Sequence, residues 1–229
     1  MSDARPQREA RPLGALVEDV SPVAVPGPAV IAGRFVRLER LAPPRHAGAI
    51  HAANEGADWV WDYLGYGPFP SSAAYRLWQE QMAALADPFF YAIVREGQAL
   101  GVAAFLRIEP AHRVVEIGHI QMAPPLQRST AASEAIMLMV RWAIEAGYRR
   151  VEWKCDALNA PSRRAALRFG FSFEGIFRQH LIVKGRNRDT AWYAMTDRDW
   201  PVIEARWKRW LDPANFVAEG RAIRRLGEA

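Results

Sequence analysis

The sequence has little sulfur chemistry and no long apolar run. Its 229 residues include a single cysteine, Cys155, which excludes an intramolecular disulfide. No spacing of histidine and cysteine resembles a zinc site. No apolar stretch approaches the roughly 20 residues of a membrane span, and the N-terminus lacks the apolar core of a signal peptide. These absences predict a cytoplasmic protein with no metal and no membrane contact.

The composition suits one large domain. Half of the residues are hydrophobic, which supplies a substantial core, and the length fits one domain better than two small ones. Residues 1–30 mix Arg, Pro, Ala and Val without periodicity and predict an irregular N-terminal arm. We expect residues 31–211 to form the domain and residues 212–229 to form a C-terminal tail.

Positive charge is concentrated in one part of the chain. The formal net charge is +5, but residues 141–190 alone hold eleven Lys and Arg against five Asp and Glu, an excess of six. A phosphorylated ligand would explain this asymmetry, and so would a solvated arginine-rich surface. Aromatic and basic residues do not alternate along the window, which disfavours nucleic acid as a partner.

Apolar periodicity and turn residues predict the order of the elements. A segment with five aromatic residues, 59–69, is expected to form a short helix and a loop that line a pocket, although a core cluster explains it as well. The remaining elements are a strand at 35–39, helices at 43–55 and 71–86, strands at 89–95, 101–108 and 113–122, a helix at 129–146, a strand at 150–156, a helix at 159–170, strand from 171 onward with a hairpin of 179–184 and 188–195, and a helix at 197–211.

The stretch from Gln121 to Ala135 joins a strand to a long helix through small and hydroxylated residues. A helix start leaves several backbone N–H groups without partners and carries partial positive charge, so small side chains there let phosphate oxygens approach. Arg128 would add a fixed positive charge. An ordinary helix capped by Ser129 or Thr130 explains the same residues equally well.

Two groups of residues resemble motifs of one enzyme superfamily. Gln127-Arg-Ser-Thr-Ala-Ala132 resembles the pyrophosphate loop Q/R-x-x-G-x-G/A of the GNAT superfamily of acetyl-CoA-dependent N-acetyltransferases. Asn159-Ala-Pro-Ser162, followed by Phe169-Gly-Phe171 and Glu174-Gly175, is similar to its downstream N-x-x-S and GF-x-x-EG elements. The nearest branch is RimJ/RimL-like, and the resemblance covers about residues 33–200. One position departs from the pattern, because Thr130 stands where the loop has glycine.

The resemblance implies a fold and a cofactor. The fold is an α/β mixed sheet, mostly antiparallel, splayed at the fourth strand and covered by helices on both faces. Acetyl-CoA would lie with its pyrophosphate on the turn and its pantetheine arm along the splayed strand, 113–122. The implied cofactor-binding residues are Gln127, Arg128, Ser129, Thr130, Ala131 and Ala132 at the turn, Ile120 and Met122 through their backbone, and Asn159 at the pantetheine arm.

The implied reaction needs few catalytic side chains. Acyl transfer from a thioester to an amine requires a neutral amine, a positioned carbonyl and a proton for the departing thiolate. Glu116 and His119 are the polar residues of the splayed strand, and either could take the proton of the amine through water. Alternatively, Glu116 pairs with an arginine and His119 is a hydrogen-bonded core residue. By the resemblance Ser162 is the proton donor to the thiol, although it could simply cap a helix.

The acceptor is expected among Trp59, Trp61, Tyr63 and Tyr66, attacking directly in a ternary complex. An acyl-enzyme on Cys155 is disfavoured, because that residue lies in an apolar-rich strand without a histidine neighbour. The polar segment 184–190 either rims the acceptor cleft or is a solvated turn. The competing hypothesis is a non-catalytic module of the same fold that senses acyl-CoA or binds RNA. The sequence leaves monomer and homodimer open.

Overall fold

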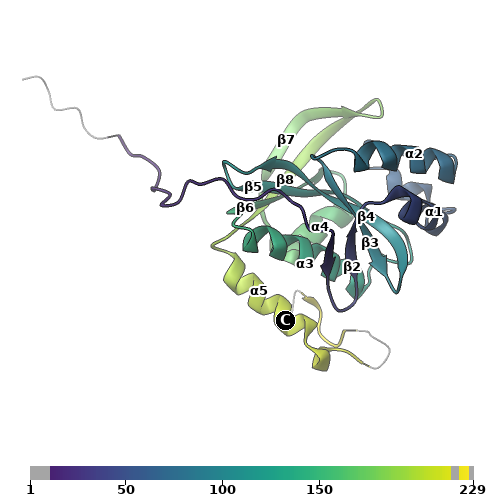
Figure 1. Cartoon of the computed structure of the whole chain (residues 1–229). Helices are drawn as coiled ribbons and strands as arrows, with labels where there is room; N and C mark the ends of the chain where they lie inside the picture. Colours follow the sequence, from purple (N-terminus) through teal and green to yellow (C-terminus); the bar gives the residue numbers. More distant parts are fainter. Residues whose placement is uncertain (1–10, 218–221, 227–229) are drawn as a thin grey trace, which may run out of the picture.

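The computed structural model describes residues 11–217 and 222–226. Eight strands form one sheet in the order β1-β2-β3-β4-β5-β6-β8-β7, antiparallel throughout except between β5 and β6 (Figure 1). The elements are β1 Val30–Ala32, β2 Arg37–Arg40, α1 Pro43–Ala53, η1 Asp58–Trp61, α2 Ser72–Ala83, β3 Phe89–Arg95, β4 Gln98–Glu109, β5 Val114–Met122, α3 Thr130–Glu145, β6 Arg150–Asp156, α4 Ala160–Phe169, β7 Ser172–Val183, β8 Arg186–Thr196, α5 Trp200–Leu211 and η2 Pro213–Asn215.

Helices cover both faces of the sheet, as the family resemblance implied. On one face α1 and α2 lie together against β3 and β4, and they share with these strands a cluster of buried residues that includes Ile50, Tyr75 and Phe90 (Figure 1). On the other face α3, α4 and α5 bury the larger cluster, with Ile136, Phe169 and Trp207 among its members. The sheet therefore has two separate hydrophobic cores, one on each side.

The ends of α3 and α4 follow from their capping residues. Ser129 precedes α3, and its hydroxyl accepts from the backbone N–H of Ala132 at 3.0 Å. Asn159 precedes α4 and accepts from the N–H of Ser162 at 3.1 Å. Gly170 ends α4 with φ +100°, a conformation that glycine adopts without strain. Both caps agree with the sequence prediction, and they fix the turns that precede α3 and α4.

A buried carboxylate joins α3 to the loop between β1 and β2. The Glu134 side chain accepts from the backbone N–H of Arg34 at 2.9 Å and from that of Phe35 at 2.6 Å. Gly33 lies against the same carboxylate, and a Cβ added there would come within 2.5 Å of it. A side chain at position 33 would therefore displace the Glu134 carboxylate from these two hydrogen bonds.

Replacing Glu134 with alanine is expected to destabilise the fold by about 3 kcal/mol, because two partly buried N–H groups lose a charged acceptor. Denaturant unfolding of the variant measures the effect. Glu145→Ala is the matched control, since Glu145 is an exposed glutamate in the same helix. Equal stability of the two variants would show that the Glu134 contacts add nothing to the fold.

The two terminal segments are held at several points of the described chain. In the N-terminal arm, Ala24 and Pro28 accept hydrogen bonds through their carbonyls from the hydroxyls of Tyr148 at 3.0 Å and Tyr91 at 2.9 Å. Beyond α5, the indole of Trp210 donates to the Arg224 carbonyl at 3.0 Å, and Leu226 is buried. Both segments pack on the domain, so the domain limits at residues 31 and 211 stay predictions.

The last hairpin differs from the sequence prediction. β7 begins at Ser172 and is continuous to Val183, and the turn lies at Lys184-Gly185, with Gly185 at φ +73°. Arg186 and Asn187 belong to β8 rather than to the turn. β7 is an edge strand with most of its side chains exposed, so it lacks the alternation that identifies half-buried strands.

Candidate active site

The two parallel strands at the centre of the sheet separate along their length. β5 and β6 are paired at three positions, Val114 with Arg150, Val115 with Val151 and Glu116 with Glu152. In the described chain β5 then runs on to Met122 and β6 to Asp156 without pairing to each other. We call this opening the gap. An unpaired strand edge offers N–H and C=O groups to an extended chain that contains amides.

A bulge in β5 lies beside the gap. Ala104 pairs with Gly118 and Val102 with Gln121, so β5 has one more residue than β4 between these positions. His119 occupies the bulge with φ +48°. The sequence predicted a bulge here from the broken alternation around Gly118. Because of it, Glu116 and His119 both lie on the face of α1 and α2 instead of on opposite faces.

Four charged side chains cluster on that face at the base of the gap, and we call them the charged quartet: Glu116, Glu152, Lys154 and Arg107. The Lys154 ammonium lies 2.5 Å from Glu116 Oε2 and 3.9 Å from Glu152 Oε2. Arg107 lies 3.7 Å from Glu116. Lys154 also rests 4.1 Å above the ring of Trp192. Three of the four side chains are less than 10% exposed, which is unusual for charged groups away from functional sites.

The carboxylate of Glu116 leans over Gly118. A Cβ added to Gly118 would lie 3.2 Å from Glu116 Oε1, so glycine leaves space for the carboxylate to reach toward the gap. Burial raises the pKa of Glu116 above its ordinary value, and the charge of Lys154 only partly offsets this. A carboxylate with a raised pKa is a better proton acceptor than an ordinary one.

His119 is packed by aromatic rings. Its ring lies 5.6 Å from that of Tyr66 and 5.1 Å from that of Phe90. Burial, with a smaller effect of the Arg188 charge, lowers the pKa of His119 to about 4, so the imidazole is neutral at physiological pH. It makes no hydrogen bond among residues 11–217 and 222–226.

A hydroxyl lies on the opposite face of the sheet. Ser162, in the first turn of α4, accepts a hydrogen bond from the indole N–H of Trp153 at 3.0 Å. Its backbone N–H is held by the Asn159 cap, so the Ser162 hydroxyl does not cap the helix itself. Burial raises the pKa of the neighbouring Cys155 thiol, with which Ser162 also interacts. A buried thiol of this kind is not poised to act as a nucleophile.

At the turn before α3, two of the predicted phosphate ligands are already engaged. The Gln127 amide donates to the Met122 carbonyl at 2.7 Å, which fixes the turn to the end of β5. The Ser129 hydroxyl donates to the Leu126 carbonyl at 2.6 Å and accepts from Ala132. Their side chains shape the turn, and the Met122 carbonyl and the Ala132 N–H are occupied.

The N–H groups of Thr130 and Ala131 remain for an anion. They belong to the first turn of α3, where no intrahelical acceptor exists. Arg128, exposed and with φ +58°, adds a cation that has no ion pair within the described part of the chain. These groups fit the pyrophosphate of acetyl-CoA, and the unpaired edge of β5 at Ile120 fits its amide-containing arm. When bound, acetyl-CoA would supply the acetyl group as a thioester.

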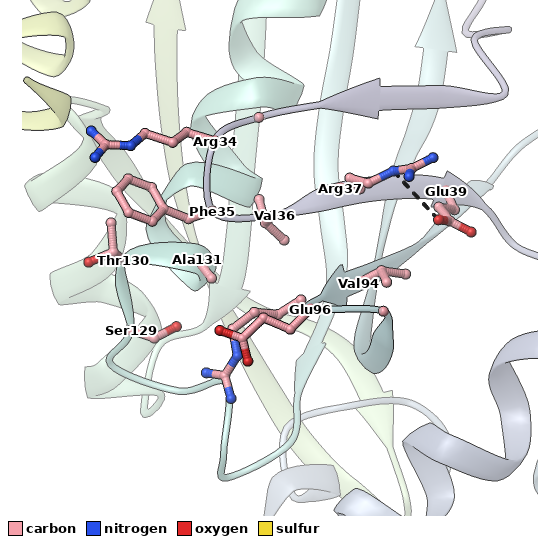
Figure 2. A pocket seen from close by; sticks show the side chains of 13 residues that line it. Arg34, Phe35, Val36, Arg37, Glu39, Val94, Glu96, Ser129, Thr130 and Ala131 are labelled. Carbon is pink, nitrogen blue, oxygen red and sulfur yellow. Dashed lines mark ion pairs between the residues drawn. The ribbon is translucent and has the colours of Figure 1, made fainter. Parts of the chain in front are cut away.

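A cavity of about 610 Å³ adjoins the same turn but does not reach the gap. Ser129, Thr130 and Ala131 form one side of it, and Arg37 and Glu39 lie on another (Figure 2). Its remaining lining comes from the β1–β2 loop, the end of β3 and the β3–β4 turn, not from β6 or α4. The cavity therefore lies beside the turn before α3, away from Glu116, His119 and Ser162.

The aromatic segment divides between core and surface. Trp61 is buried at 4% exposure and packs on Tyr75 and Phe69, so its side chain belongs to the core of α1 and α2. Tyr66 is half-buried between Trp78 and His119. Trp59 and Tyr63 are exposed. Tyr66 is thus the predicted acceptor residue that the structure brings to the bulge, while Trp59 and Tyr63 lie further out.

Two hydrogen bonds tie this segment across the face of the sheet. The Tyr63 hydroxyl donates to the Leu158 carbonyl, between β6 and α4, at 3.3 Å. Lys184, at the tip of the β7–β8 hairpin, donates to the Trp61 carbonyl at 2.8 Å. These bonds join the aromatic segment to the loop after β6 and to the tip of the hairpin. Figure 1 shows the hairpin of β7 and β8 projecting beyond the rest of the sheet.

Sequence reasoning missed Glu152, Lys154, Arg107 and Trp192 at this site. A signal was present in β6, where Glu152 and Lys154 alternate with the apolar Trp153 and Cys155. Two charged residues on one face of a central strand indicate a polar site rather than a core. Among the described residues, no cluster of His, Cys, Asp or Glu could hold a metal ion, and no helix could cross a membrane.

Comparisons with known proteins agree with the fold. The model of the acetyltransferase (GNAT) domain matches residues 36–172. A crystal structure of a GCN5-related N-acetyltransferase from Brucella melitensis is 40% identical, with a TM-score of 0.89 over 93% of this chain and 98% of that one. A probable GNAT acetyltransferase from Chromobacterium violaceum is 39% identical, with a TM-score of 0.79 over 85% of this chain and 99% of that one. The chain therefore belongs to the GNAT acetyltransferase family.

A curated relative supports the predicted branch. The ribosomal-protein-serine acetyltransferase of Escherichia coli is 31% identical over 105 residues, which cover 45% of this chain and 58% of the relative. The chain thus spans little more than half the length of the curated relatives it matches. The RimJ/RimL-like resemblance read from the Asn159 and Gly170 motifs is confirmed at this modest identity.

Proposed function

We propose that this protein transfers the acetyl group of acetyl-CoA to a primary amine, on a protein N-terminus or a small molecule, by direct attack in a ternary complex. The observation that carries the proposal is the gap between β5 and β6, with the carboxylate of Glu116 on one face of the sheet and the hydroxyl of Ser162 on the other. An amine that attacks from the face of Glu116 needs a proton acceptor there. A thiol that departs on the face of Ser162 needs a proton donor there.

Each residue then has a distinct part in the reaction. Glu116 takes the proton of the attacking amine, directly or through one water. Backbone N–H groups along the unpaired edge of β5 hold the acetyl carbonyl and stabilise the negative charge that develops on it. Ser162 gives a proton to the departing thiolate. Thr130, Ala131 and Arg128 hold the pyrophosphate, and the Asn159 amide nitrogen is free to bind the pantetheine arm.

Titration calorimetry with acetyl-CoA and a thiol-release assay with primary amines test this function. We expect acetyl-CoA to bind and thiol release to depend on the amine, with panels that include peptide N-termini, polyamines and aminoacyl compounds. Absence of acetyl-CoA binding, together with salt-sensitive binding of RNA, would overturn the proposal in favour of a non-catalytic module. Acetyl-CoA binding without turnover on any amine would support an acyl-CoA sensor instead.

A further inference from the structure

Arg188, on the face of the sheet that carries α1 and α2, has no ion-pair or hydrogen-bond partner for its side chain among the described residues. It lies on β8 opposite Leu181 of β7, two residues before Thr190, which pairs with the last residue of β6, Asp156. Alternate residues of a strand share a face, so Arg188 lies on the same side as Thr190 and Trp192. Trp192 contacts Lys154 of the charged quartet. Arg188 therefore follows Trp192 and Thr190 along the same face of β8, near the open end of the gap.

No described carboxylate pairs with Arg188, and that of Asp156, opposite Thr190, accepts instead from the backbone N–H of Leu158 at 2.8 Å. The Arg188 Nε atom is buried and has no hydrogen-bond partner, and the residue forms no ion pair within the described chain. In the charged quartet two carboxylates already face two cations. His180 on the adjacent strand is bonded to Thr190, at 2.9 Å, and not to Arg188. A partly buried guanidinium without an anion is costly, so its partner is expected to arrive with a ligand.

The charge of Arg188 lies near both strands that border the gap. Burial has the largest effect on both residues: it lowers the pKa of His119 and raises the pKa of Cys155. The positive charge of Arg188 has a smaller effect and lowers the pKa of both. His119 is on β5 and Cys155 on β6, so Arg188 is within electrostatic reach of the two strands that bound the gap. Hydrogen bonds at Tyr63 and Lys184 join the aromatic segment to the loop after β6 and to the tip of the hairpin that carries Arg188.

We propose that Arg188 anchors a carboxylate that the acceptor carries close to the amine that is acetylated. This inference rests on the proposed function and names the class of acceptor. Of the two substrates, acetyl-CoA has its charge on phosphates, which fit the turn before α3, and its acetyl and pantetheine groups are neutral. The acceptor is thus the substrate that can pair with Arg188. A guanidinium binds a carboxylate with two parallel hydrogen bonds, which fixes the orientation of the amine as well as its charge.

Matched acceptors that differ in a single charge test the proposal. One pair is the peptide Ser-Asp-Ala-Ala and its Ser-Asn-Ala-Ala counterpart, and a second pair is β-alanine and β-alaninamide. We expect wild-type kcat/KM to favour the acidic member of at least one pair by about tenfold, as one charged hydrogen bond provides. The peptide pair reports an acidic side chain near an N-terminus, and the β-alanine pair reports a small amino acid.

Variants of Arg188 separate charge recognition from folding. Arg188→Met is expected to remove the preference while its rate on the amide member stays near that of the wild type, and Arg188→Lys is expected to keep part of the preference. Arg186→Met, an exposed arginine in the same hairpin, is the matched control and should leave the preference unchanged. Thermal melting checks that each variant is folded.

Several results would overturn this inference without touching the proposed function. They are a wild-type enzyme with no preference in either pair, an Arg188→Met variant that loses rate equally on both members, and failure to acetylate any of the four acceptors while other amines react. Loss of acetyl-CoA binding in the wild type is a different result, because it would overturn the proposed function itself.

Discussion

Replacing Glu116 with glutamine should lower kcat/KM about a thousandfold on any amine that the wild-type protein acetylates. The amide keeps the shape of the side chain over Gly118 but cannot accept a proton. The amine would then have to lose its proton to bulk water, which is slower than transfer to a positioned carboxylate. The rate of thiol release at saturating acetyl-CoA measures this loss.

The pH dependence of the wild-type enzyme gives a second readout. Glu116 must be ionised to act as the base, and burial raises its pKa above the ordinary value. Activity should therefore rise with pH through this raised pKa and be lost below it, where the carboxyl is protonated. In Glu116→Gln this limb of the pH profile should disappear, which a purely structural defect would not cause.

Glu152→Gln is the matched control for this prediction. Glu152 lies opposite Glu116 in the register, is buried to the same extent and contacts the same Lys154. We expect it to retain most of the activity, since it lacks the space over Gly118 that directs Glu116 toward the gap. Two results together would assign the role of base to His119 instead. His119→Asn would lose more activity than Glu116→Gln, and Glu116→Gln would keep the acidic limb of the pH profile.

The sequence predicted the strands and helices around the gap well, because their signals are local. The limits of β6 at Arg150 and Asp156 are those read from the sequence, and the caps Ser129 and Asn159 were recognisable from side chains that accept from nearby N–H groups. β1 was missed because three residues that follow a proline-rich arm carry no periodicity. Its strand form depends on pairing with β2.

The candidate site was predictable only in part, since its most important contacts join residues that are far apart in the sequence. Glu116 and Ser162 were singled out from the sequence, but the pairing of Glu116 with Lys154 depends on the register of β5 against β6. The hydrogen bond of Trp153 to Ser162 likewise depends on how α4 packs on β6. The roles of Gln127 and Ser129 in holding the turn needed the geometry of the backbone, which a motif does not contain.

Replacing Ser162 with alanine should lower kcat about a hundredfold, with little change in the KM for acetyl-CoA. The hydroxyl accepts from the Trp153 indole, so one of its lone pairs is occupied and its own proton is directed elsewhere. A hydroxyl that accepts a hydrogen bond is also a stronger donor. Without this donor the departing thiolate leaves as a free anion, which is a poor leaving group in an enclosed site. Single-turnover kinetics with acetyl-CoA measures the change in the chemical step.

The hydrogen bond from Trp153 predicts a smaller effect of the same kind. Trp153→Phe keeps an aromatic ring in the core but loses the N–H that orients Ser162, and we expect kcat to fall about tenfold. Trp142→Phe, at a half-buried tryptophan packed on Phe105 and Tyr148, is the control for the loss of ring volume. If Trp153 acts through Ser162, the double variant Trp153→Phe, Ser162→Ala should be no slower than Ser162→Ala alone.

The acidity of the leaving thiol distinguishes proton donation from a structural role. A thioester of a pantetheine analogue with a more acidic thiol needs less help to depart, because its thiolate is more stable. The factor by which Ser162→Ala and Trp153→Phe are slower than the wild-type enzyme should therefore be smaller with this thioester than with acetyl-CoA. A deficit that is the same for both thioesters would show that Ser162 positions the substrate and does not give its proton to the thiolate.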